Sequence, residues 1–154
     1  MTRRAQGFTL LEMLVVIAIL GIMGTLTYGA YDGLTQRSEV RAAADTLAFN
    51  LNKARTSAKR DHARWTLELV GARTYRVGPA GGTLTTVTLP QKINFDSSTV
   101  SARTSVNFDP PWGARTEYQS GSSDVPTFTL ESVGRTRVTR TVKVISILGE
   151  VSVQ

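Results

Sequence analysis

The hydrophobic pattern begins with one long apolar stretch near the N-terminus. From Phe8 to Tyr28, 21 consecutive residues carry a single charge, on Glu12. At about 1.5 Å of rise per residue, a helix of this length spans about 32 Å, which is enough to cross the hydrocarbon core of a bilayer. The pattern therefore predicts a transmembrane helix over residues 8–28.

A second helical pattern follows, with apolar residues recurring at alternating steps of four and three. Such spacing places them in one stripe along a helix, with the charged residues mainly off it. The stripe consists of Val40, Ala44, Leu47, Leu51, Ala54 and Ala58. We expect one helix of about 50 residues, from Thr9 to Arg60, ending at Asp61 and His62. Residues 29–61 form its second half, and Gly29 and Gly33 predict a bend or local melting between the halves.

After residue 62 the period changes from that of a helix to that of strands. Apolar and polar residues alternate in short segments separated by Gly, Pro and Ser/Thr-rich turns. The expected strands are Trp65–Leu69, Thr74–Val77, Leu84–Leu89, Ile93–Phe95, Val106–Phe108, Thr127–Glu131, Val138–Leu148 and Glu150–Val153. The predicted fold class is α+β: a long N-terminal helix whose second half packs on an antiparallel β-rich head, residues 62–154.

The residues before the apolar stretch set its orientation. Arg3 and Arg4 precede it, so the positive-inside rule places the N-terminus in the cytoplasm and the head outside. A cleaved secretory signal peptide and a plain single-span anchor are the alternatives. Glu12 counts against both, because an ionised carboxylate in hydrocarbon costs about 2.5–3.5 kcal/mol or more and implies a partner.

The segment from Arg3 to Glu12, RRAQGFTLLE, resembles the type III signal of type IV pilins and of the pseudopilins of type II secretion. The resemblance implies that residues 1–7 are a leader, that prepilin peptidase cuts between Gly7 and Phe8, and that it methylates the new N-terminus at Phe8. It also implies that Glu12 of one subunit pairs with the amine of Phe8 in its neighbour and fixes the axial register. The implied protein waits in the inner membrane and assembles with other pilin subunits into a helical filament.

Two further segments are similar to the GspH/FimT group. Residues 47–58 resemble its "L…L…AR..A" helix, and residues 144–153 resemble its final "I.I...G.V.V" hairpin. This resemblance implies a minor pilin or pseudopilin incorporated at or near the filament tip. A major pilin is the weaker reading, because the C-terminal disulfide loop usual in major pilins needs cysteines and this chain has none. A pilus and a secretion pseudopilus both remain open, since both use the same signal and helix.

Composition adds a basic balance and excludes several chemistries. The 154 residues include 18 Lys and Arg against 12 Asp and Glu, a net charge of +6, which falls to +4 without residues 1–7. The lack of cysteine excludes thiol catalysis, disulfides and cysteine-ligated metals. His62, the one histidine, has no metal-ligand or acid–base partner near it in sequence. We expect no enzyme, no cofactor and no metal.

A possible DNA-binding motif lies near the C-terminus. Gly134-Arg135-Thr136-Arg137 matches the GRxR motif that the FimT branch associates with DNA uptake, and Arg140 follows it. Arginines 135, 137 and 140 would grip phosphates. In the family this motif lies on the last hairpin, where this chain has Gly149-Glu150-Val151-Ser152. The alternative is a solvated turn, which pairing of these arginines with Glu117, Asp124 or Glu131 would favour.

Overall fold

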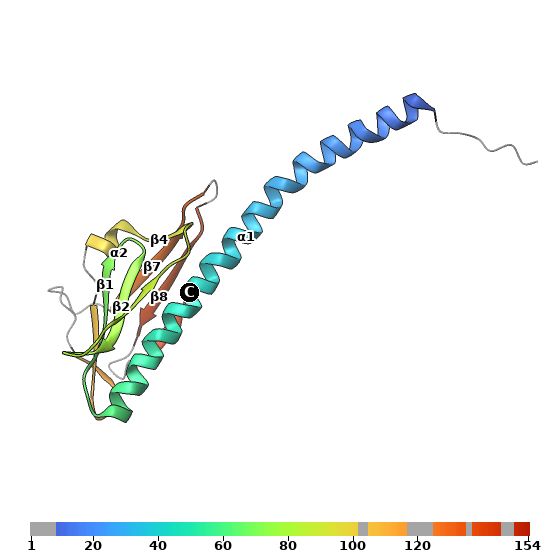
Figure 1. Ribbon diagram of the computed structural model, residues 1–154. Helices are drawn as coiled ribbons and strands as arrows, with labels where there is room; N and C mark the ends of the chain where they lie inside the picture. The colour runs from blue at the N-terminus through green and yellow to red at the C-terminus, as the bar shows by residue number, and fades with distance from the viewer. Residues whose placement is uncertain (1–8, 102–104, 117–124, 135–136, 146–149) are drawn as a thin grey trace, which may run out of the picture. The chain divides into compact units, whose positions relative to one another are not determined.

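The computed structural model describes residues 9–101, 105–116, 125–134, 137–145 and 150–154. The chain divides into two compact units, Met1–Thr35 and Gln36–Gln154. One helix, α1 (Leu10–Asp61, 52 residues), contributes to both units (Figure 1). The predicted α+β class, a long N-terminal helix followed by antiparallel sheets, is confirmed.

The first unit consists of the N-terminal part of α1. Thr9 precedes the helix, and its Oγ1 accepts a hydrogen bond from the backbone N–H of Glu12 at 3.3 Å, the geometry of an N-cap. The predicted local melting is not observed, because α1 continues through residues 29–33. A glycine costs a helix only about 1 kcal/mol, which neighbouring helix-forming residues offset. Among the residues that the structure describes, no helix is long and apolar enough to cross a membrane.

In the second unit, the C-terminal part of α1 buries one stripe against the sheets. All six residues of the predicted stripe are fully buried, and Ala43 joins them. The helix ends where His62 adopts a left-handed conformation with φ 48°, a common way for a helix to stop. The predicted amphipathic half of the helix is therefore confirmed.

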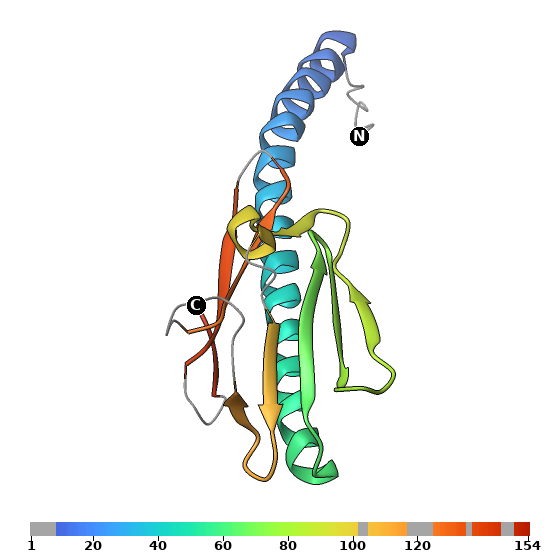
Figure 2. The ribbon, with the colours of Figure 1, turned by 90° about the vertical axis from the view of Figure 1, so that its left-hand side faces the viewer.

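The head contains two antiparallel sheets. The five-stranded sheet has the order β3-β2-β1-β5-β6, and the four-stranded sheet has the order β4-β7-β8-β9. Their strands are β1 (Trp65–Gly71), β2 (Thr74–Pro79), β3 (Thr85–Thr88), β4 (Ile93–Phe95), β5 (Ser105–Asp109), β6 (Ala114–Thr116), β7 (Thr127–Ser132), β8 (Thr139–Val144) and β9 (Val151–Val153). Figures 1 and 2 show the β1–β2 and β7–β8 pairs on the same side of the C-terminal part of α1, which they cover.

One core joins the helix stripe to both sheets. Alternation along the strands turns one face inward, most clearly in β7, where Phe128, Leu130 and Ser132 are buried and their neighbours are not. Tyr75, Phe95 and Phe108 supply the other large buried rings.

Three parts of the head differ from the prediction. The short helix α2 (Ser97–Ser101) and strand β6 were not predicted. Strand β8 is shorter than the predicted Val138–Leu148, and residues 146–149 lie outside the described part of the chain. β6 has three residues and pairs with β5 across a tight turn, so its sequence carries too little alternation to mark a strand.

Candidate functional site

The first candidate site is the apolar surface of the first unit. Every large apolar side chain from Leu10 to Met23 is exposed, Leu10 to 84% and Leu11 to 74%. The others are Met13, Leu14, Val15, Val16, Ile17, Ile19, Leu20, Ile22 and Met23. They cover all sides of the helix, and a helix that is hydrophobic all round needs a surrounding apolar phase or apolar partners. We call this set the apolar collar.

Glu12 is the one charged residue within the apolar collar. Its position in the first turn of α1 is favourable, because the N-terminus of a helix carries partial positive charge. Among the described residues, no cation lies within ion-pair distance of its carboxylate. Covering the collar would bury this charge, and a buried unpaired charge is strongly destabilising. The arrangement therefore calls for a cation from outside the described part of the chain.

The two predicted processing residues, Gly7 and Phe8, precede the described part of the chain. Their place beside Glu12 therefore stays a prediction. Thr9, which sequence reasoning did not single out, caps the helix that presents Glu12. The T-x-x-E spacing from Thr9 to Glu12 is the sequence signal that would have found it.

Arg137 is held by carboxylates of its own head. Its Nε donates to Glu131 Oε2 at 2.8 Å, and its Nη2 donates to Asp96 Oδ1 at 3.3 Å. The hydrogen bond to Glu131 is the main cause that raises the pKa of Arg137. The pKa of Asp96 is lowered, chiefly because the Ser98 hydroxyl and N–H donate to it, with a smaller part from Arg137. This is the pairing with Glu131 that favours the solvated-turn alternative for the arginine motif.

Arg140 lies in a different environment. It is exposed on β8, opposite Leu130 of β7. Together with Arg41, Asp45 and Val153 it lines a cavity of about 260 Å³ between the helix and the last strands. Sequence reasoning missed Arg41, since only the i, i+4 spacing to Asp45 marks it. Arg135 lies outside the described residues, so the structure shows no joint grip by the three arginines.

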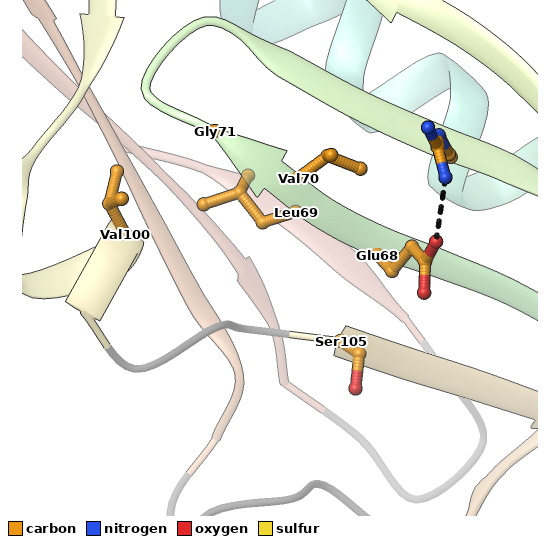
Figure 3. A pocket seen from close by; sticks show the side chains of 7 residues that line it. Glu68, Leu69, Val70, Gly71, Val100 and Ser105 are labelled. Atoms are coloured by element: carbon orange, nitrogen blue, oxygen red, sulfur yellow. Dashed lines mark ion pairs between the residues drawn. The ribbon is translucent and has the colours of Figure 1, made fainter.

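A second cavity, of about 420 Å³, lies beside β1, β2 and α2 and is shown in Figure 3. Its charged groups are Glu68 and Arg76, whose carboxylate and guanidinium are 4.0 Å apart. Ser105 adds a hydroxyl, and Val70 and Val100 add apolar walls. The two charges offset each other, so the cavity offers no strong preference for a charged ligand. In the described part of the chain, no three metal-ligating side chains come together.

Comparison with known proteins places the strongest similarity at the N-terminus. Residues 2–28 match the prokaryotic N-terminal methylation motif. Over 60 residues, 39% of this chain, the sequence is 38% identical to a type IV major pilin protein, PilE1, of Neisseria gonorrhoeae and to a fimbrial protein of Neisseria meningitidis serogroup B. The aligned part spans about a third of each relative, 36% and 35%. No solved structure gives a significant match.

Proposed function

We propose that this chain, which is type IV pilin-like in its N-terminal motif and in its α+β architecture, is a minor pilin or a pseudopilin. It would act as a structural subunit of a type IV pilus or a type II secretion pseudopilus and carry out no catalysis. One observation carries the proposal: an exposed apolar collar with a single carboxylate lies within the stretch that matches a methylation motif, residues 2–28. Packing the collars of neighbouring subunits together would cover this surface and form the filament core.

Before assembly, the same segment serves as the membrane anchor. Residues 8–28 would lie in the inner membrane as a single span, with residues 1–7 in the cytoplasm and the head exported. The apolar length of this stretch and the position of Arg3 and Arg4 support this orientation. Prepilin peptidase would then cut between Gly7 and Phe8 and methylate Phe8.

Glu12 sets the register of assembly. Cleavage creates a free amine at Phe8, and this amine would supply the cation that Glu12 lacks. Pairing between neighbouring subunits, rather than within one, would make the buried ion pair form only at the correct axial step. The polar contact thus contributes specificity, while the apolar surface contributes most of the affinity.

The head directs the subunit to its place in the filament. The GspH/FimT-like helix and final hairpin correspond to the α1 stripe and to the β8–β9 pair, which bury apolar residues against each other. We propose a position at or near the tip, where the head contacts other minor subunits.

The proposal is tested in cells that lack the chromosomal copy and express Glu12→Ala. This variant is expected to be processed normally but to be lost from sheared filaments, because its collar packs without a register contact. Glu39→Ala removes a carboxylate further along the same helix and is the matched control. Intact mass of the filament-borne protein checks cleavage after Gly7. Filaments that contain Glu12→Ala at the wild-type level, or protein that retains Met1, would refute the proposal.

DNA binding for uptake in natural transformation is the second candidate. It is favoured by the convergence of Arg41 and Arg140 on one exposed cavity, and the pairing of Arg137 with Glu131 and Asp96 counts against it. Binding of the purified full chain to duplex DNA across a salt series tests it. If the arginines grip phosphates, Arg140→Ala and Arg135→Ala each flatten the salt dependence by about one contact. Binding that neither substitution changes would remove this candidate.

A further inference from the structure

Among the described residues of the second unit, two large aromatic side chains are highly exposed and lie outside its core. Trp112, in the turn between β5 and β6, is 71% exposed, and Phe49, on α1, is 65% exposed. Buried aromatic rings contribute large apolar areas to cores, and exposed ones are enriched at interfaces, where tryptophan often dominates the binding energy. The stability of the head therefore does not explain why either ring is present.

Phe49 forms part of a groove on the outer side of the helix. It lies between Leu47 and Leu51, which are fully buried, so helical periodicity turns Phe49 away from the sheets. The groove has a volume of about 320 Å³ and is lined by Phe49, Asn52, Lys53, Thr56, Ser57 and Arg60. In the described part of the chain, no carboxylate lies within ion-pair distance of Lys53. The groove thus combines an aromatic wall with the unpaired charge of Lys53, whereas its other cation, Arg60, forms an ion pair with Asp61.

Trp112 is presented on a turn that is fixed to the helix. Gly113, the next residue, has φ 63° and approaches α1 so closely that an added Cβ would lie 2.7 Å from the carbonyl oxygen of Arg55. Pro110 and Pro111 precede Trp112 and restrict the backbone on its other side. A side chain on such a turn loses little conformational entropy when it binds, which favours a role as an anchor.

We propose that Trp112 of one copy of this chain binds in the groove beside Phe49 of a second copy. The face of a tryptophan ring is electrostatically negative and attracts cations such as Lys53 and Arg60, while its edge packs against a second aromatic ring such as Phe49. Both rings are exposed within one copy, so they do not cover each other in the same chain. The attraction between a ring face and Lys53, with the exposed Trp112 and the groove carried by the same chain, favours a second copy as the occupant.

This contact has a defined consequence for assembly. Trp112 and the groove are different surfaces, so the contact is heterologous and leaves a free groove on one copy of a pair and a free Trp112 on the other. It would bring two copies side by side in the membrane through their heads. The inference goes beyond the proposed function, which rests on the apolar collar, because the contact needs only two copies in one membrane.

The test is photo-cross-linking of the full chain reconstituted in lipid vesicles. Trp112 is replaced by the photoreactive aromatic residue p-benzoylphenylalanine, and unlabelled copies are mixed with heavy-isotope copies before illumination. We expect cross-linked dimers that contain one light and one heavy copy, with the link mapped by mass spectrometry to residues 49–60. Phe49→Ala and Lys53→Glu are each expected to lower the yield at least about fivefold, the effect of losing a strong interface residue.

Val133→Ala is the matched control, because it truncates another exposed apolar residue of the head, and the yield should not change. Three outcomes would overturn the proposal: no light–heavy dimers form, the link maps elsewhere on the chain, or residue 112 cross-links to added single-stranded DNA instead of to the groove. The dimers should persist in the Glu12→Ala chain. The two proposals can therefore fail separately. Loss of the Glu12→Ala chain from filaments tests the proposed function, and the cross-link tests this contact.

Discussion

A hydrogen bond in the head links α1 to β2. Asn50 Nδ2 donates to the hydroxyl of Tyr75 at 2.7 Å, and the Tyr75 ring meets Phe95 edge to face with centroids 6.1 Å apart. Burial raises the pKa of Tyr75, and the Asn50 hydrogen bond opposes that rise to a smaller extent. The hydroxyl therefore stays protonated and continues to accept from Asn50 in the folded head.

Removing this hydroxyl should lower the stability of the head by more than its small buried area alone would predict. Tyr75→Phe leaves the partly buried amide of Asn50 without its acceptor, so we expect the free energy of unfolding to fall by about 1 kcal/mol or more. Urea unfolding of the detergent-solubilised chain measures it. Tyr75→Phe combined with Asn50→Ala should cost less than the sum of the two single changes. Strict additivity would show that the contact contributes nothing.

The carboxylate that receives Arg137 gives a pH-dependent prediction. The pKa of Asp96 is lower in the folded head than its ordinary 3.8, so the charged form favours folding above that pH. This contribution is lost as the pH falls below 3.8 through the lower folded value. Because the Ser98 hydroxyl is the largest cause, Ser98→Ala should raise the pKa of Asp96 more than Arg137→Ala does. Carboxyl-carbon NMR titration ranks the two variants, and the reverse order would contradict the assignment.

At the scale of elements, the turn between β5 and β6 depends on Gly113. Its φ of 63° strains any other residue, and a Cβ there would also collide with the backbone of α1. Gly81 has a φ of 80° but open space around it, and Gly71 has open space and no such φ. Left-handed backbone costs an L-residue about 1–2 kcal/mol. We therefore expect the loss of stability to increase from Gly71→Ala through Gly81→Ala to Gly113→Ala.

Thermal unfolding of the three variants measures this series. Gly71→Ala should lie within about 0.5 kcal/mol of wild type, as surface changes usually do. If Gly113→Ala costs no more than Gly81→Ala, the close approach of the turn to α1 contributes nothing. The rigid presentation of Trp112 would then lose its basis.

The elements that the sequence predicted well are those whose signal is local. The stripe from Val40 to Ala58 repeats along one helix, and the alternation in β7 needs only six residues, so both could be found by period. Strand order could not be found in this way. β1 pairs with β5, with Trp65 opposite Phe108, although β2, β3, β4 and α2 lie between them in the sequence, and no local pattern encodes such a pairing.

The candidate site was predictable to the same extent. Glu12 is conspicuous as the one charge in an apolar stretch, and Arg137 is conspicuous in a short motif. The partners of these residues are not local. Arg137 donates a hydrogen bond to Asp96, which is 41 positions away in the sequence. Arg140 and Arg41 line the same cavity only because β8 lies beside the helix. Such contacts follow from tertiary packing, which one sequence does not display.

For the whole molecule, the two units divide the apolar residues by role. The collar, from Leu10 to Met23, exposes its side chains, whereas every residue of the buried core lies between Val40 and Val144. The second unit, Gln36–Gln154, therefore contains all of the core and none of the collar. Deleting residues 1–35 therefore removes none of the buried core residues that the structure describes.

The fragment 36–154 should accordingly fold alone and remain soluble. Leu47→Ala, which empties a fully buried site, is expected to lower its free energy of unfolding by about 2–5 kcal/mol. Phe49→Ala, two positions away but exposed, should change it by less than about 0.5 kcal/mol. Urea unfolding of the fragment and of the full chain should give the same differences for both variants.

These paired substitutions also separate stability from assembly. If Phe49→Ala leaves the fragment as stable as wild type but lowers the cross-link from Trp112, the ring serves contacts between copies and not the fold. If Phe49→Ala unfolds the fragment, its exposure has another cause and the groove loses its proposed occupant. A fragment that aggregates would show that the first unit is needed to cover part of the head. Leu47→Ala and Phe49→Ala thus test whether the inward face of α1 stabilises the fold while its outward face binds a second copy.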